Sequence, residues 1–317
     1  MGINMDLTLE SVGVCNLKCK MCPTSYYSCN KGIMSDETFN NIIPYLNLFK
    51  KIELTGWGEP LLDNKIFEKA KIYKENNCTF SFTTNATLLD EEKTRKIIEL
   101  SPASIQFSID SGDSINYQNI RINSDFQEVI KNIKYFLEYN KNTKKISTSV
   151  ALVIMKSNIS FIDKFIDLVN SLEVDFVSFK PIDIIVSEEQ IKETLEKNEL
   201  IKIIDQIKLK LKKNISLVTW NIYKREKGDC LAKAGKNIFI SWDGNVYPCC
   251  VFALNNNITI LKKKIAFYRR FQQDNFCLGN VNKEALNEIL EHKHYLDFIN
   301  TFKNKKIPAK CRGCLLI

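Results

Sequence analysis

Three cysteines near the start of the chain constrain its fold more than any other feature. Cys15, Cys19 and Cys22 lie in the segment Cys-Asn-Leu-Lys-Cys-Lys-Met-Cys, with three and then two residues between them. Thiolates this close together can bind one centre only if the backbone wraps around it as a loop. A structural zinc site takes four protein ligands, whereas a four-iron cluster held by three thiolates leaves one iron open. The spacing therefore predicts a metal centre that can bind a cofactor or substrate.

This spacing, just after a predicted strand, resembles the signature of the radical S-adenosylmethionine (SAM) superfamily. The resemblance implies that Cys15, Cys19 and Cys22 hold a [4Fe-4S] cluster whose open iron binds SAM. It also implies reductive cleavage of SAM to a 5'-deoxyadenosyl radical. An electron donor such as a flavodoxin or a ferredoxin is implied as a partner.

Short β-rich segments alternate with amphipathic helical segments from residue 6 to about 213, which is typical of βα units and a parallel sheet. Ser35, Ser160 and Ser187 are expected to begin three of the helices. We expect an α/β fold: a partial (β/α)6 TIM-like barrel over residues 1–220, with its sites at the C-terminal ends of the strands, and a small cluster domain over 221–317. The expected strands are 6–12, 51–55, 79–84, 103–109, 146–154 and 175–180, and the expected helices 36–49, 65–76, 90–100, 125–139, 160–171 and 188–213.

The ends of the second and third predicted strands resemble superfamily segments that surround SAM. Gly56-Trp57-Gly58-Glu59 resembles the GGEP segment, with Trp57 where its first glycine would fall. This implies that Gly56, Gly58 and Glu59 lie against the amino group of SAM, because glycine permits close approach and a carboxylate accepts from an ammonium. Thr84-Asn85 is similar to the TTNG turn beneath the cofactor. The simpler alternative for both segments is an ordinary βα turn.

The fourth and sixth predicted strands end in further candidates. The resemblance implies that Ser108 or Asp110 approaches the ribose and that Arg121 pairs with the SAM carboxylate. A strand-end cap and a surface arginine are the alternatives. Lys180 and Asp183 are candidate catalytic residues that contact substrate or move a proton, with a capping or solvated role as the alternative.

After about residue 221 the alternation stops and cysteines return. Asp243-Gly244 between two β-like segments, 237–241 and 246–248, predicts a hairpin. Thirteen residues separate Cys230 from Gly244 and four separate Gly244 from Cys249, similar to the opening of the SPASM and twitch extensions of radical SAM enzymes. Because the sequence continues only three residues past Cys314, we expect the reduced, twitch-like version with one auxiliary [4Fe-4S] cluster.

The resemblance implies Cys230, Cys249, Cys311 and Cys314 as its ligands, with Cys250 as a substitute for Cys249. Four thiolates would leave no iron open, which favours electron transfer over substrate binding. A four-cysteine zinc site is the alternative. The remaining cysteines, Cys29, Cys78 and Cys277, are read as ordinary thiols. His292 and His294 are expected on one helix over 283–302, pointing away from each other.

Composition narrows the cellular compartment of the protein and the kinds of partner that it binds. Eleven cysteines without a basic, apolar leader segment favour metal chemistry in a reducing cytoplasm over disulfides. No apolar segment approaches the roughly 20 residues of a membrane span. The net charge of +8 comes from lysines spread along helical segments, which favours a solvated surface over nucleic-acid binding.

The leading functional hypothesis is hydrogen abstraction from a small-molecule or peptide substrate, for oxidation, dehydrogenation or peptide modification. Two alternatives remain. One is cyclisation or rearrangement of a nucleotide or small molecule bound at the auxiliary cluster. The other is a non-catalytic iron–sulfur or zinc scaffold.

Overall fold

The computed structural model describes residues 5–26, 31–143, 146–219, 230, 233–254 and 276–311. These residues form two compact units, each assembled from segments that are distant in sequence. One unit contains the described residues of 1–15, 27–81 and 225–317, and the other those of 16–26 and 82–224. The predicted boundary between residues 220 and 221 stays a prediction.

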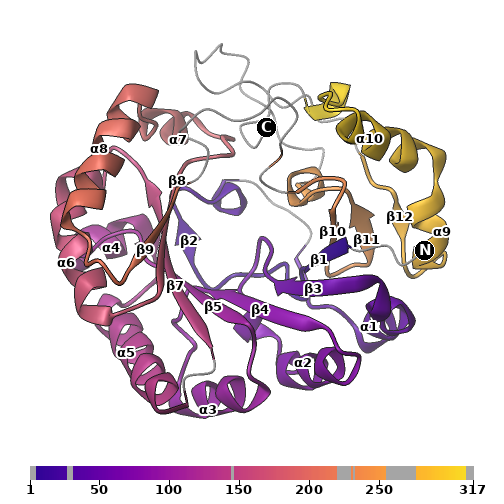
Figure 1. The fold of residues 1–317 in the computed structure, drawn as a ribbon, viewed down its shortest axis with the longest axis horizontal. Helices are drawn as coiled ribbons and strands as arrows, with labels where there is room; N and C mark the ends of the chain where they lie inside the picture. Colours follow the sequence, from indigo (N-terminus) through magenta and orange to yellow (C-terminus); the bar gives the residue numbers. More distant parts are fainter. Residues whose placement is uncertain are drawn as a thin grey trace. The chain divides into compact units, whose positions relative to one another are not determined.

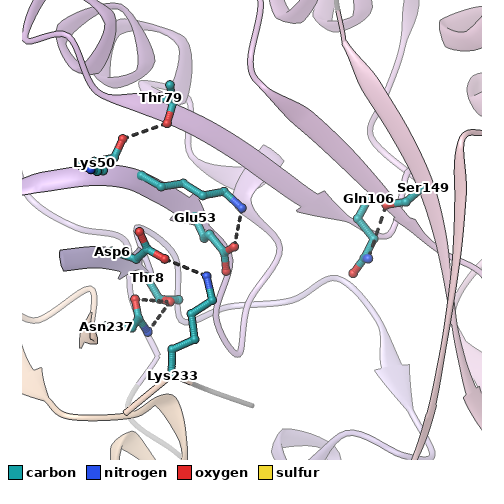
Figure 2. Close-up of polar contacts among 10 residues, drawn as sticks. Asp6, Thr8, Lys50, Glu53, Thr79, Gln106, Ser149, Lys233 and Asn237 are labelled. Carbon is teal, nitrogen blue, oxygen red and sulfur yellow. Dashed lines mark hydrogen bonds and ion pairs between the residues drawn. The ribbon is translucent and has the colours of Figure 1, made fainter. Parts of the chain in front are cut away.

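In the first unit, the N-terminal strand is a central strand of the sheet. The strand on one side of it is near in sequence, and the strand on the other side comes from the C-terminal region. β1 (Met5–Leu9) pairs in parallel with β3 (Phe49–Leu54) and with β10 (Asn237–Ile240), so the order is β12-β11-β10-β1-β3. Figure 2 shows two polar contacts between β1 and the segment that contains β10: Lys233 donates to Asp6 at 2.9 Å, and the Asn237 amide donates to Thr8 at 3.1 Å. The two remaining strands are β11 (Asn245–Tyr247) and β12 (Gly279–Asn280).

Helices α1 (Asp36–Ile42) and α2 (Ile66–Glu75) contact each other through aromatic rings in this unit. The rings of Phe39 and Tyr73 meet edge-on at 5.8 Å. Ser35 begins α1 by accepting from the Thr38 N–H, as predicted. The other elements here are η2 (Ile43–Leu48), η3 (Pro60–Leu62), η5 (Cys250–Ala253), α9 (Leu286–Glu291), α10 (Lys293–Lys303) and η6 (Ala309–Cys311).

The second unit has a parallel sheet in the order β5-β7-β8-β9, with α3, α5 and α6 on its outer side (Figure 1). Buried aromatic pairs fix two of these helices: Phe107 meets Phe136 at 5.5 Å and Phe165 meets Phe179 at 5.7 Å. The strands are β5 (Ser104–Ser108), β7 (Ser147–Ile154), β8 (Phe176–Pro181) and β9 (Ser216–Thr219), and the helices α3 (Glu91–Leu100), α4 (Ser114–Ile120), α5 (Phe126–Thr143), α6 (Ile162–Leu172), α7 (Glu188–Lys192) and α8 (Lys197–Lys210).

Most predicted elements are confirmed, including β4 (Thr79–Thr84), which spans the division between the units. Three predictions are wrong in detail. Ser160 lies inside the short helix η4 (Ile159–Phe161) rather than capping α6, which begins at Ile162 without a side-chain cap. The helix over 188–213 is two helices, and so is the helix over 283–302, because the backbone leaves the helical conformation at His292.

No helix among the described residues is both long enough and apolar enough to cross a membrane.

Candidate functional site

A short strand pair in the second unit holds the loop that carries Cys19 and Cys22. β2 (Lys18–Cys19) pairs antiparallel with β6 (Arg121–Ile122), which places Cys19 opposite Arg121. The backbone then turns tightly, because the Cys22 N–H donates to the Cys19 carbonyl at 3.0 Å. Cys19 is buried, whereas Cys15 and Cys22 are partly exposed. The predicted donor set of Cys15, Cys19 and Cys22 has the three thiolates that a four-iron cluster with one open iron requires.

Arg121 is a buried cation beside this loop. It is 7% exposed, its Nε lies 2.7 Å from the carboxylate of the fully buried Asp110, and its Nη1 lies 3.8 Å from the Cys19 sulfur. Burial lowers the pKa of Arg121, but the neighbouring Asp110 and Cys19 outweigh burial and hold this pKa above its usual value. The alternative interpretation, that Arg121 is a surface arginine, is therefore wrong, because its guanidinium is buried beside the Asp110 carboxylate.

Asp110 also joins the ends of two strands. Its second carboxylate oxygen accepts from the Val153 N–H at 2.8 Å, and its backbone carbonyl accepts from the Asn158 amide at 3.0 Å. The Asn158 oxygen in turn accepts from the Met155 N–H at 2.8 Å. Ser108 lies at the end of β5, two residues before Asp110. These bonds hold the predicted ribose-binding segment at the C-terminal ends of β5 and β7.

The Thr84-Asn85 turn is bonded to the residue that follows Cys15. The Asn85 amide donates to the Asn16 oxygen at 3.0 Å, and the Asn16 amide donates to the Thr87 hydroxyl at 2.7 Å. Thr84 accepts from the N–H of Ala86, whose φ of 60° is left-handed. Asn16 was missed by the sequence reasoning, although its place directly after Cys15 is a signal that could have found it.

In the first unit, the Gly56–Glu59 segment packs directly on the backbone that leads to Cys15. The Glu59 N–H donates to the Val14 carbonyl at 2.9 Å. A Cβ atom on Gly58 would lie 2.6 Å from the Val14 oxygen and closer still to the Val12 oxygen. Only glycine fits at position 58, because the backbone there lies against the chain's own carbonyls; the predicted approach to SAM stays a prediction. Glu59 is buried and begins η3 by accepting from the Leu61 N–H at 3.2 Å.

Glu10 is a second residue that the sequence reasoning missed. It follows β1 directly, is 5% exposed, and accepts from the Trp57 N–H at 2.6 Å. The pKa of the Glu10 carboxyl is raised to about 8, chiefly by burial; the Trp57 N–H lowers this pKa and nearby Asp243 raises it, and both effects are smaller than that of burial. An acidic residue inside the predicted strand 6–12, next to the apolar positions Leu7 and Leu9, was the available sequence signal.

The pH dependence of stability tests this burial. The folded state keeps the Glu10 proton up to about pH 8, whereas the unfolded chain releases it near 4.5, so stability falls as pH rises through that window. Between about pH 6 and 8 we expect the free energy of unfolding to fall by about 2–3 kcal/mol more in wild type than in Glu10→Gln, which keeps an acceptor for Trp57. Denaturant titrations at several pH values measure this. Equal slopes for the two proteins would show that Glu10 is ionised in the fold.

The C-terminal hairpin forms as predicted, with Ile240 opposite Val246 and Gly244 in a left-handed turn at φ 83°. It delivers Cys249, which is 6% exposed, to the start of η5. A hydrogen bond with the Cys250 thiol, then burial and the nearby Cys230, raise the pKa of Cys249 well above its usual value.

The other cysteines differ in their surroundings. Cys311 is buried in η6, and Cys314 and Cys29 lie outside the described residues. Cys78 is an ordinary buried thiol that donates to the Leu46 carbonyl at 3.2 Å, and Cys277 is a half-buried one that donates to the Gly279 carbonyl at 3.2 Å. Within the described ranges, no three His, Cys, Asp or Glu side chains are drawn together as closely as a bound metal ion requires.

Lys180 and Asp183 form an ion pair at the end of β8. Their charged atoms are 3.4 Å apart and both side chains are partly exposed. The structure therefore brings the two candidate catalytic residues together at a strand C-terminal end.

The prediction that His292 and His294 point away from each other is wrong. Their ring centroids are 5.4 Å apart, because His292 lies between α9 and α10 and helical spacing does not apply to it. The His292 ring is bonded to the Leu278 carbonyl at 2.9 Å and lies 3.1 Å from Glu284.

Comparison with known proteins defines the class. Residues 9–169 match the radical SAM superfamily, and residues 230–315 match the iron–sulfur cluster-binding domain called SPASM. The chain belongs to the radical SAM superfamily and carries a SPASM domain. The predicted cofactors, SAM, a SAM-site [4Fe-4S] cluster and auxiliary iron–sulfur chemistry, are confirmed at this level.

Individual relatives cover nearly the whole chain. A protein of Pyrococcus furiosus named tungsten-containing aldehyde ferredoxin oxidoreductase cofactor-modifying protein is 26% identical, over 98% of this chain and 87% of its own length. The structure of Streptococcus suis SuiB bound to SAM matches 99% of this chain and 72% of its own, with 18% identity and a TM-score of 0.72. That of anSMEcpe with bound SAM matches 98% and 87%, with 20% identity and a TM-score of 0.69. These matches confirm the predicted α/β class with a parallel sheet.

Proposed function

We propose that this chain is a radical SAM oxidoreductase that abstracts a hydrogen atom from a small-molecule or peptide substrate and completes its dehydrogenation. The observation that carries the proposal is the presence of both cluster-binding regions on one chain, the radical SAM region over 9–169 and the SPASM region over 230–315. When bound, a reduced cluster supplies the electron that cleaves SAM to methionine and the 5'-deoxyadenosyl radical. The protein positions the reactants and shields them.

The proposed SAM site combines ligands and polar contacts from several strand ends. Cys15, Cys19 and Cys22 are the proposed ligands of its cluster. The packing of Gly58 and Glu59 on the backbone that leads to Cys15 supports a role for Gly56, Gly58 and Glu59 at the ammonium group of SAM. The remaining proposed SAM contacts are residues of the second unit: Thr84, Asn85, Ser108, Asp110 and Arg121. The pairing of Cys19 with Arg121 supports the last of these.

The proposed auxiliary ligands are Cys230, Cys249, Cys311 and Cys314. The burial of Cys249 and Cys311 supports this set. Four thiolates close a cluster, so its proposed role is that of an electron acceptor and not of a substrate-binding Lewis acid. A flavodoxin or a ferredoxin is the proposed donor for the first cluster.

Hydrogen transfer to the 5'-deoxyadenosyl radical leaves a substrate radical, and loss of one further electron and one proton completes a dehydrogenation. The Lys180–Asp183 pair is the proposed site of proton movement, because its charged atoms lie 3.4 Å apart at the end of β8 and both side chains are partly exposed.

Named relatives support both substrate classes. SuiB has been solved with the precursor peptide SuiA and anSMEcpe with peptides, whereas the Pyrococcus furiosus relative is named for cofactor modification. A second candidate is nucleotide cyclisation, since a GTP 3',8-cyclase of Petrotoga mobilis is 32% identical over 53% of this chain. The proposed four-thiolate set favours dehydrogenation over that alternative.

Iron analysis with a SAM-cleavage assay tests the proposal. Anaerobically reconstituted wild type should hold about eight irons per chain and cleave SAM with dithionite. The variant with Cys15, Cys19 and Cys22 all changed to Ala should hold about four and form no 5'-deoxyadenosine. Asp183→Asn should keep substrate-free SAM cleavage, since the proposed proton step comes later. Wild type that binds zinc and leaves SAM intact would refute the enzyme and support the scaffold.

A further inference from the structure

Trp57 joins three segments of the first unit that are far apart in sequence. Its backbone N–H donates to the buried carboxyl of Glu10 at 2.6 Å. Its indole Nε1–H donates to the backbone carbonyl of Cys250 at 3.0 Å, across 193 positions of the chain. One residue, through its backbone and its ring, thus connects the end of β1, the Gly56–Glu59 segment and the turn that carries Cys249 and Cys250.

The bonded carbonyl belongs to the turn whose geometry separates those two cysteines. Cys249 is extended, with φ −163° and ψ 147°, and its thiol is buried, whereas Cys250 begins η5 and is partly exposed. The Phe252 N–H closes the turn on the Cys249 carbonyl at 3.1 Å. Holding the Cys250 carbonyl therefore also holds the direction in which Cys249 points.

The backbone of Trp57 lies within two residues of the proposed SAM contacts Gly56, Gly58 and Glu59. Gly58 is packed on the Val12 and Val14 carbonyls, and Glu59 donates from its N–H to Val14, so the segment cannot shift without moving Trp57. Glu10 leaves no room for a side chain at Gly56, since a Cβ there would lie 2.6 Å from the Glu10 Cγ. The tryptophan is therefore held firmly at its backbone and reaches out to the cysteine turn with its ring.

We propose that Trp57 is a positioning residue that holds the Cys249–Cys250 turn in place from the SAM-binding segment, and so sets the stability and spectrum of the auxiliary cluster. This rests on the proposed ligand role of Cys249. A hydrogen bond to the backbone next to a ligand acts on a metal site as an outer-shell contact, and loss of such contacts typically weakens metal binding about 10- to 100-fold.

The test uses the full chain in the background in which Cys15, Cys19 and Cys22 are Ala, so that only the auxiliary cluster contributes. Trp57→Phe keeps an aromatic ring and removes the N–H donor. We expect it to lose iron to a chelator about tenfold faster than the parent and to change the EPR g values and the midpoint potential of the reduced cluster. Tyr73→Phe is the matched control, because the buried Tyr73 hydroxyl has no hydrogen-bond partner among the described residues.

Each outcome has one meaning. Chelator kinetics, g values and potential equal to those of the parent in Trp57→Phe would overturn the inference while leaving the proposed function intact. A parent that holds no iron at all would instead refute the auxiliary cluster. If Trp57→Phe does not fold, Trp57→Gly, which places the GGEP glycine at this position, is measured in the same way. Retention of the parent spectrum in that variant would equally overturn the inference.

Discussion

Gly58→Ala is expected to lose SAM binding and to unfold more easily. The added Cβ would lie 2.6 Å from the Val14 oxygen and closer still to the Val12 oxygen, both of them backbone atoms that cannot rotate away. Overpacking of this kind costs about 3 kcal/mol at the upper end of its usual range. Relief requires the Gly56–Glu59 segment to move off the backbone that leads to Cys15, so the affinity for SAM should fall at least about tenfold. Equilibrium dialysis of SAM and denaturant unfolding measure the two effects.

Gly279→Ala is the matched control for this change. Its Cβ would meet the Glu284 carboxylate at 2.5 Å, which is the far end of a flexible side chain, and the buried Ile289 Cγ1 at 2.8 Å, so the contacts are with side chains and not with backbone. We expect a cost of about 1 kcal/mol and unchanged SAM affinity. If Gly58→Ala behaves like this control, the segment is not packed as the structure shows.

Arg121→Met is expected to destabilise the protein by about 3–5 kcal/mol, the usual cost of leaving a buried charge without its partner. Asp110 is fully buried, and the guanidinium 2.7 Å away is its counter-charge. The same substitution removes the cation 3.8 Å from the Cys19 sulfur. Denaturant unfolding under anaerobic conditions measures the loss.

The double variant Asp110→Asn with Arg121→Met separates charge from packing. Asparagine removes the orphaned charge and keeps an oxygen to accept from the Val153 N–H, which now lies 2.8 Å from Asp110. We expect it to recover at least half of the stability lost in Arg121→Met. Loss of SAM affinity in this stable double variant would support the predicted contact with the SAM carboxylate. A cost below about 1 kcal/mol for Arg121→Met alone would contradict the buried ion pair.

Most elements of the fold were accessible from local pattern. Alternating β-rich and amphipathic segments located the six strands from β1 to β8 that bear the parallel sheet, since apolar periodicity is a property of neighbouring residues. Ser35 and Ser187 were readable as caps for the same reason. The strands β2, β6 and β9 were missed, because such short strands are defined by distant partners and carry too few residues for a period.

The candidate site divides in the same way. The spacing of Cys15, Cys19 and Cys22, the Gly56–Glu59 segment and the hairpin before Cys249 were visible as local motifs, and the family follows from them. The burial of Glu10 and the hydrogen bond from Trp57 to Cys250 could not be predicted from the sequence. A hydrogen bond between residues 193 positions apart produces no local sequence pattern. The prediction that His292 and His294 point away from each other was wrong for a related reason, because a break between two helices changed the spacing on which it depended.

The sequence alone determined the superfamily, the cofactors and the order of strands and helices, because these depend on spacing and periodicity along a few consecutive residues. Only the tertiary structure decided that Arg121 is enclosed with Asp110, that Glu10 is a buried acid, and that β1 pairs with β10 from the far end of the chain. Burial and pairing are set by segments that meet only after folding. The charge and hydrogen bonding of a side chain follow from those meetings and not from its neighbours in sequence.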